Sequence, residues 1–330
     1  MEVNYQLETK SPFAPAGLSQ QVYPLAPAST LVSIALVGIA SSQDYAECRR
    51  IMRQASKNYS FASKYLPAEK LPHVEALYAL MRVGDDRVDV AYQGFASPHE
   101  AIADWEQAYW RTFESGNSPH PVLRAYLDTS LKFGIPAETM ADYFRAMHAD
   151  LTINRFHTFE DLMHYIDGSA IPVGRAMTYI LGVRQPYSVS QATPSADNLS
   201  IAMQLSNFWR DIGEDWQRGR VYLPLEDLEF FRYSEADLAA GRINGQFIDM
   251  LEFEFERTET YFRASRRGVG MLASGRVAVM SALEIYRAIL FAIRANHYNV
   301  FTRRASTTKL RKLSLATKAF FQVRQIADLK

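Results

Sequence analysis

The stretch from Gln204 to Asp215 constrains the fold of this chain most, because its polar and apolar residues separate at the spacing of an α-helix. At about 100° per residue, six polar side chains share an arc roughly 100° wide. They are Gln204, Asn207, Asp211, Glu214, Asp215 and Arg218. An adjacent arc is apolar and holds Ile201, Ala202, Leu205, Phe208, Trp209, Ile212 and Trp216. The pattern predicts a helix with one buried face and one face of oxygen ligands.

The polar face has two explanations. Acidic stripes on helices usually face water. Water-facing positions favour Glu and Lys, however, because Asp and Asn are poorer helix formers whose short side chains compete with the backbone. Asn207, Asp211 and Asp215 depart from that preference, so a chemical role is the alternative. On this helix alone both interpretations stay open.

A second acidic cluster lies in the predicted helix Val74 to Tyr92. Its polar residues Tyr78, Arg82, Asp85 and Asp89 fall within roughly 60° of one another, with Asp86 at the margin. Like charges this close destabilise a helix unless a cation lies between them. Two such faces across a cavity could hold Mg²⁺, which is usually bound by one or two carboxylates together with substrate phosphates. The arrangement suggests diphosphate chemistry.

Composition sets limits on this hypothesis. The chain has 330 residues, of which 48% are hydrophobic and 22% charged, so it can bury a substantial core. Its 36 basic and 36 acidic residues cancel, so bulk charge points neither to nucleic acid nor to an anionic membrane. A single cysteine, Cys48, excludes an internal disulfide framework and fits a reducing cytoplasm.

Residues 1–41 are predicted to be an N-terminal extension, partly disordered or loosely packed, that precedes a catalytic domain over residues 42–330. Four prolines, at positions 12, 15, 24 and 27, favour extended chain. The apolar run Leu31 to Ala40 is about half as long as a bilayer span and lacks the basic flank of a signal peptide. We expect it to pack on the domain or to skim a membrane, with packing favoured.

The chain after the N-terminal extension is predicted to be all-α. Helices are predicted at His99 to Ser115, Pro121 to Phe133, Pro136 to Leu151, Phe159 to Ile166, Ser169 to Leu181, Gln246 to Arg267 and Ala278 to Phe301. A loop rich in Ser, Pro and Gln is expected at Gln185 to Asn198, and a basic tail after Arg303. No stretch alternates with period two over a length that would predict a sheet.

Several residues have both a structural and a functional interpretation. Arg82 and Arg210 could clamp a diphosphate by bidentate hydrogen bonds or could simply pair with acids of their own helices. The aromatic residues Tyr78, Tyr165, Tyr286 and Tyr298 could line an apolar cavity, where aromatic rings stabilise a carbocation, or could be ordinary core.

Taken together, the motifs resemble those of the squalene/phytoene synthases. Asp85-Asp86-Arg87-Val88-Asp89, preceded by Tyr78 and Arg82, is similar to the first aspartate-rich motif of that family. The run from Gln204 to Asp215, followed by Gly219 to Pro224, is similar to the second. Further similarities are Ser56 to Phe61, Tyr165 with Gly168 to Ala170, and Tyr286 with Asn296 to Tyr298.

The resemblance implies a single-domain isoprenoid synthase fold, a helical bundle around a central cavity. It implies that Asp85, Asp89, Asn207, Asp211 and Asp215 hold Mg²⁺, with Asp86 as a nearby acid, and Mn²⁺ as a possible substitute. It implies diphosphate contacts from Ser56, Arg82, Gln204 and Arg210, and reacting carbons bordered by Tyr78, Tyr165 and Tyr286. Asn58 departs from the pattern, because many members have a second serine there.

The implied reaction is head-to-head condensation of two prenyl diphosphates through a cyclopropyl diphosphate. We favour two geranylgeranyl diphosphates giving phytoene, for carotenoid biosynthesis. The alternative is a C30 enzyme that forms squalene, dehydrosqualene or hydroxysqualene, with NADPH required only for squalene. A non-catalytic assembly subunit is a third hypothesis, disfavoured because a scaffold has no use for clustered like charge. Peripheral association with the inner face of a membrane and the oligomeric state stay open.

Overall fold

The computed structural model describes residues 39–89 and 94–328. The predictions for the N-terminal extension and for most of Leu31 to Ala40 lie outside these ranges. Among the helices in them, none is long and apolar enough to cross a membrane. The ranges also contain no β-strand, only the isolated bridges Arg155 to Val221 and Val183 to Leu272, so the predicted all-α class is confirmed.

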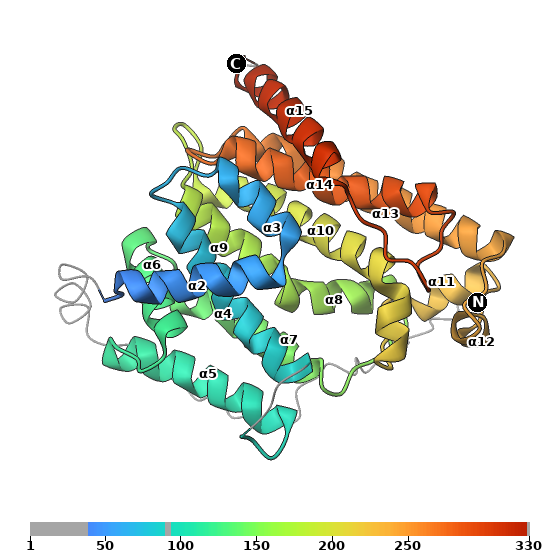
Figure 1. The fold of residues 1–330 in the computed structure, drawn as a ribbon, viewed down its shortest axis with the longest axis horizontal. Helices are drawn as coiled ribbons and strands as arrows, with labels where there is room; N and C mark the ends of the chain where they lie inside the picture. The colour runs from blue at the N-terminus through green and yellow to red at the C-terminus, as the bar shows by residue number, and fades with distance from the viewer. Residues whose placement is uncertain (1–38, 90–93, 329–330) are drawn as a thin grey trace, which may run out of the picture.

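The helices are joined mostly by short connections (Figure 1). The first half contains α2 (Ser42–Ala55), α3 (Lys57–Ala62), α4 (Leu71–Asp89), α5 (Pro98–Ser115), α6 (Pro121–Phe133), α7 (Ala141–Ala149), α8 (Phe159–Ser169) and α9 (Ile171–Leu181). The second half contains α10 (Val189–Gln217), α11 (Leu225–Phe230), α12 (Glu235–Ala239), α13 (Gly245–Val269), α14 (Arg276–Ala295) and α15 (Lys309–Asp328). Short 3₁₀ turns lie at Ser63–Tyr65 and Ala137–Met140.

Two hydrophobic cores meet within the bundle. One is built mainly from α4, α5, α6 and α7, around the fully buried Trp105 and Tyr109. The other joins α10 to α13 and α14 around Trp209, whose indole N–H donates to the hydroxyl of Thr258 at 2.9 Å. Figure 1 shows α10 inside the bundle, where it packs against α9, α13 and α14. This central position places the acidic face of α10 within the protein.

The predicted loop from Gln185 to Asn198 is largely wrong, because α10 begins at Val189. Ser188 caps the helix: its hydroxyl accepts from the Gln191 N–H, and the Gln191 side chain accepts from the Ser188 N–H. This reciprocal cap satisfies two backbone donors and starts a helix that continues past Pro194. The Ser- and Pro-rich composition concealed this signal.

The C-terminal region also differs from expectation. The helix predicted to reach Phe301 ends at Ala295, because His297 and Tyr298 adopt left-handed backbone conformations with φ of 51° and 57°. Tyr298 donates its hydroxyl to Glu252 and lines neither of the two cavities described below, so of its two interpretations the structure favours ordinary packing over a place in an apolar cavity. The predicted basic tail instead contains α15.

Candidate active site

The acidic faces of α4 and α10 border the same polar cavity, which has a volume of about 1020 Å³. Twelve of the predicted site residues line it: Ser56, Tyr78, Arg82, Asp85, Asp89, Tyr165, Gln204, Asn207, Arg210, Asp211, Asp215 and Tyr286. Asp86 is not among the lining residues and instead pairs with Arg82 at 2.5 Å. The structure therefore brings the two motifs together but turns Asp86 away from the set.

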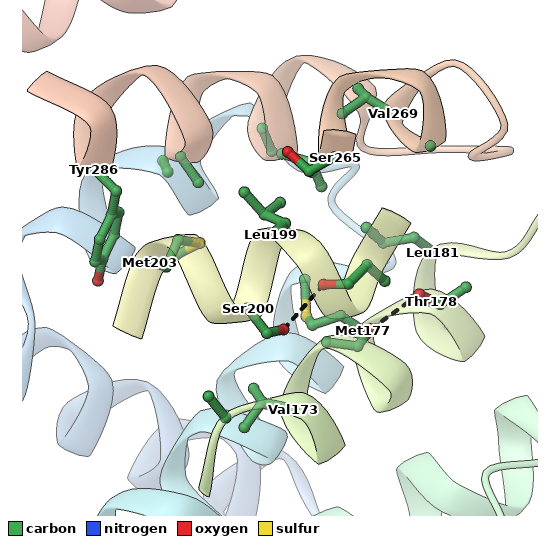
Figure 2. Close-up of a pocket in the computed structure, with 18 of the residues that line it drawn as sticks. Val173, Met177, Thr178, Leu181, Leu199, Ser200, Met203, Ser265, Val269 and Tyr286 are labelled. Atoms are coloured by element: carbon green, nitrogen blue, oxygen red, sulfur yellow. Dashed lines mark hydrogen bonds between the residues drawn. The ribbon is translucent and has the colours of Figure 1, made fainter. Parts of the chain in front are cut away.

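An apolar chamber continues from this polar cavity. The two spaces share Tyr59, Ser169, Gln204, Asn207 and Tyr286 as lining residues. Figure 2 shows side chains of α9, α10 and α13 around the chamber, with Tyr286 at one end and Leu181 and Val269 toward the other. The predicted central cavity thus has a polar mouth and an apolar interior.

Three hydroxyl groups in the chamber wall donate to backbone carbonyls of their own helices, whereas the buried hydroxyl of Ser169, where the chamber meets the polar cavity, has no partner. Thr178 donates to Gly174 at 2.9 Å and Ser200 to Ala196 at 3.1 Å, as drawn in Figure 2. Ser265 donates to Phe262 at 2.9 Å. Because these three donors are already satisfied, a hydrocarbon chain can pack against Thr178, Ser200 and Ser265 without leaving their hydroxyl hydrogens unpaired.

Arginines surround Asp211. Its two carboxylate oxygens accept hydrogen bonds of 2.8 and 2.5 Å from Arg210 and of 2.8 and 3.0 Å from Arg304. Burial acts to raise the pKa of Asp211, but the hydrogen bonds from both arginines outweigh it and hold that pKa below its usual value. Asp211 is therefore ionised, and two cations lie beside it that could also bind an anion.

Two other acids of the cavity have pKa values above their usual range. Burial raises the pKa of Asp85 to about 7, with Arg82 opposing the rise and Asp89 adding to it. Burial also raises the pKa of Asp215 to about 7, and repulsion from Asp211 adds to it. Both acids would ionise more readily beside a further cation.

The donor set fits a hard divalent cation that is shared with a ligand. In residues 39–89 and 94–328, no group of three or more His, Cys, Asp or Glu side chains is arranged to hold a metal by itself. Mg²⁺ keeps several waters and commonly takes only one or two carboxylates plus phosphate oxygens. Asp85 and Asp215, half-buried and facing one polar cavity, match that mode of binding.

Arg220 connects the two acidic regions. It donates to Asp89 at 2.8 Å and forms an ion pair with Asp150 at 3.1 Å. Asp150, which directly follows α7, also accepts from the hydroxyl of Tyr165 at 3.1 Å. Burial raises the pKa of Asp150, although Arg220 opposes this. The cluster fixes the end of α4 relative to the segment after α10.

Sequence reasoning missed part of this site. Arg220 lies in the motif from Gly219 to Pro224, which predicts no role for it. Asp150, Arg304, Lys309 and Lys312 stand outside the motifs, although all of these residues line the polar cavity. The one available signal for the last three was the excess of basic residues after position 302. Asp150 stands in no motif, so nothing in the sequence marked it.

Aromatic rings lie where the polar cavity meets the apolar chamber. The ring centroid of Tyr59 is 5.3 Å from that of Tyr78 and 5.9 Å from that of Tyr286. Burial raises the pKa of Tyr78 to about 12. These phenols therefore stay neutral, and their ring faces can stabilise positive charge without acting as strong nucleophiles.

Comparisons with known proteins agree with this geometry. The family described as squalene/phytoene synthase matches residues 52–311. A 15-cis-phytoene synthase of Synechococcus elongatus is 33% identical over 305 residues, covering 89% of this chain and 95% of its own. The 15-cis-phytoene synthase of a Synechocystis species is 35% identical over 278 residues, covering 82% of both chains.

Solved structures show the same fold. A dehydrosqualene synthase in complex with ligand superposes with a TM-score of 0.77 at 26% identity, covering 86% of this chain and 97% of its own. The squalene synthase HpnC from Alicyclobacillus acidocaldarius has a TM-score of 0.68 at 30% identity, covering 78% of this chain and 95% of its own. The predicted isoprenoid synthase fold is confirmed.

Proposed function

Because the chain belongs to the squalene/phytoene synthase family and is a prenyltransferase, we propose that it joins two geranylgeranyl diphosphates head to head to give phytoene. The condensation proceeds through a cyclopropyl diphosphate. The names of the cyanobacterial relatives support this substrate, and their similarity extends over most of the chain.

The observation that carries the proposal is the junction of the polar cavity with the apolar chamber. A prenyl diphosphate has a charged head and a long hydrocarbon tail. Its head suits the cavity bordered by Arg82, Arg210 and Arg304, and its tail suits the chamber between α9, α10 and α13. The reacting carbons next to the head then lie near Tyr78, Tyr165 and Tyr286.

We assign the cation to Asp85, Asp89, Asn207, Asp211 and Asp215, with Asp86 as a more distant acid. Bound there, Mg²⁺ would neutralise charge on the departing diphosphate, and Mn²⁺ is expected to substitute. Ser56, Arg82, Gln204 and Arg210 would contact diphosphate oxygens. Arginine suits this role because its planar group binds such oxygens with two hydrogen bonds at once.

The protein's own side chains stabilise the charges that form during the reaction and keep water away from them. When the C–O bond of one substrate breaks, its electron pair leaves with the diphosphate, and the arginines stabilise the departing oxygens. The double bond of the second substrate attacks the allylic carbocation, and the new cation closes to the cyclopropyl diphosphate as a proton is lost. The second diphosphate then leaves with its electron pair, and loss of a further proton after rearrangement gives phytoene. The apolar chamber keeps water away from that carbocation, and the neighbouring rings of Tyr59, Tyr78 and Tyr286 stabilise it.

A C30 reaction is the second candidate. The similar structures are described as dehydrosqualene synthase and squalene synthase, and the same cavity chemistry would serve farnesyl diphosphate. NADPH would be required only if the product were squalene. Since either substrate is lipophilic, we further propose that the enzyme associates peripherally with a membrane.

Product analysis tests the proposal. The purified full chain is incubated with geranylgeranyl or farnesyl diphosphate and Mg²⁺, with and without NADPH, and the hydrocarbon is identified by mass spectrometry. We expect phytoene from the C20 substrate, independent of NADPH. A C30 product formed in preference to phytoene would replace the proposal with the second candidate, and a reduced C30 product would identify a squalene synthase.

A further inference from the structure

The outward face of α15 carries an apolar stripe. Leu310 is 81% exposed, Leu313 54%, Phe320 44% and Phe321 57%. On a helix these four positions fall within an arc of roughly 100°. Large apolar side chains gathered on one exposed face, rather than scattered singly, are typical of a surface that contacts another apolar phase.

Basic residues accompany this stripe. Residues 285–327 contain no Asp or Glu, although the whole chain has equal numbers of acidic and basic residues. The basic residues in this range are Arg287, Arg294, Arg303, Arg304, Lys309, Arg311, Lys312, Lys318 and Arg324. Arg287, Arg294, Arg304 and Lys318 form ion pairs with acids elsewhere in the protein. The exposed basic residues on and beside α15 are Arg303, Lys309, Arg311 and Arg324, which give its surface a positive charge that complements an anionic surface.

The opposite face of α15 is fixed to the protein. Leu315 packs against Ile285 and Ala288 of α14. The buried carboxylate of Glu284 accepts from Lys318 at 3.2 Å and from Gln322 at 3.0 Å. Figure 1 shows α15 beside α14 at the edge of the bundle. The apolar stripe is thus held outward.

We propose that the outward face of α15 docks on an anionic lipid bilayer. A helix with aromatic and aliphatic residues on one face and basic residues at its flanks lies in a membrane interface, attracted by both apolar burial and charge. Lys309 and Lys312 in its first turn line the polar cavity. Docking therefore brings the cavity mouth to the bilayer. Direct entry of a lipophilic substrate from the bilayer would follow only if the proposed function is right, whereas the docking itself does not depend on that function.

Vesicle co-sedimentation of the full chain, without substrate, tests the docking. One set of vesicles contains phosphatidylcholine alone and the other phosphatidylcholine with phosphatidylglycerol. We expect binding to the anionic set, weakened by added salt. The double variant Leu313→Ser/Phe321→Ser should bind on the order of tenfold more weakly, because it removes two large apolar side chains from the interface.

A matched control is Phe230→Ser, which removes a side chain that is 77% exposed at the end of α11. It should bind vesicles like the parent protein. If the double variant misfolds by circular dichroism, Arg311→Gln/Arg324→Gln serves instead and should lose the preference for anionic vesicles.

Three results would overturn the inference. The first is equal binding of the parent protein and the folded double variant to anionic vesicles. The second is binding of the parent protein without preference for anionic over neutral vesicles. The third is a dimer, seen by analytical ultracentrifugation, that the double variant dissociates, since the stripe would then belong to a second copy. Turnover of the prenyl diphosphate in detergent, without vesicles, tests the proposed function separately. Failure of the docking proposal can therefore be told apart from failure of the proposed function.

Discussion

Arg304 forms two hydrogen bonds, of 2.8 and 3.0 Å, with the carboxylate of Asp211, although 93 positions separate the two residues in the chain. The contact connects the segment between α14 and α15 to the acidic face of α10. It also adds a second cation at the polar cavity, beside the one that Arg210 supplies from the neighbouring position in the sequence.

Replacing Asp211 with Ala or Asn should lower kcat by at least about 10³-fold, because the carboxylate is assigned to the cation that stabilises the leaving group. Circular dichroism should stay helical. Asp86→Asn is the matched control, since Asp86 belongs to the first aspartate-rich motif but does not line the cavity. This variant should lose far less activity. Comparable turnover by both variants would remove the metal assignment.

Arg304→Gln should raise KM for the diphosphate substrate and lower kcat/KM on the order of 10- to 100-fold, since a charged hydrogen-bond donor to the anion is lost. Steady-state kinetics measures this. Its exposed neighbour provides the comparison, because Arg303→Gln removes the same charge from a position that does not line the cavity. Equal losses in the two variants would point to bulk charge rather than to a specific contact.

Gly213→Ala should destabilise the protein and reduce turnover together. A Cβ at this position would lie 2.6 Å from the carbonyl oxygen of Val300 and 2.7 Å from Cα of Phe301, so the segment that carries Arg304 must move. We expect a loss of about 1–3 kcal/mol of unfolding free energy, read as a lower Tm. Gly245→Ala, where nothing lies within 4 Å of the added Cβ, should leave both properties nearly unchanged.

Mg²⁺ affinity should rise between pH 6 and pH 8. In the metal-free protein the pKa values of Asp85 and Asp215 are raised to about 7, so these acids are mostly protonated at pH 6 and mostly ionised at pH 8. Since the cation binds the ionised form, binding below pH 7 must release protons, and affinity falls by up to about tenfold per pH unit for each proton released.

Isothermal titration calorimetry at pH 6.5 in two buffers of different ionisation enthalpy counts those protons, with a non-hydrolysable diphosphate present. Asp85→Asn should reduce the number released. Identical heats in both buffers would show that neither acid changes protonation on binding, contrary to this expectation.

The helices whose buried faces are rich in large apolar residues were predictable from the sequence. So was the placement of the two acidic motifs at one cavity. The second half of α10 was predictable because Phe208 and Trp209 fall on one face of a helix and Asn207 and Asp211 on another. Its first half was missed, since Ser and Pro dominate there and the start depends on a cap at Ser188.

Helix α15 and the contacts across the cavity were harder to predict for a physical reason. Apolar residues lie on both faces of α15, so the usual signal of amphipathicity is weak. The inner face holds Leu315, Ala316, Ala319, Val323 and Ile326, and the outer face holds Leu310, Leu313, Phe320 and Phe321. Pairs such as Arg220 with Asp150 depend on tertiary packing, which no local spacing encodes.

Because Arg304 lies in the segment between α14 and α15, after both α4 and α10 in the chain, the polar cavity acquires its full set of charges only once that segment has been synthesised. A nascent chain that has folded as far as α14 already carries both aspartate helices and Arg210, but not the second guanidinium beside Asp211. Proteolytic cleavage between α14 and α15 would threaten the same contact, so synthesis and proteolysis both act on the charge of this cavity through one segment.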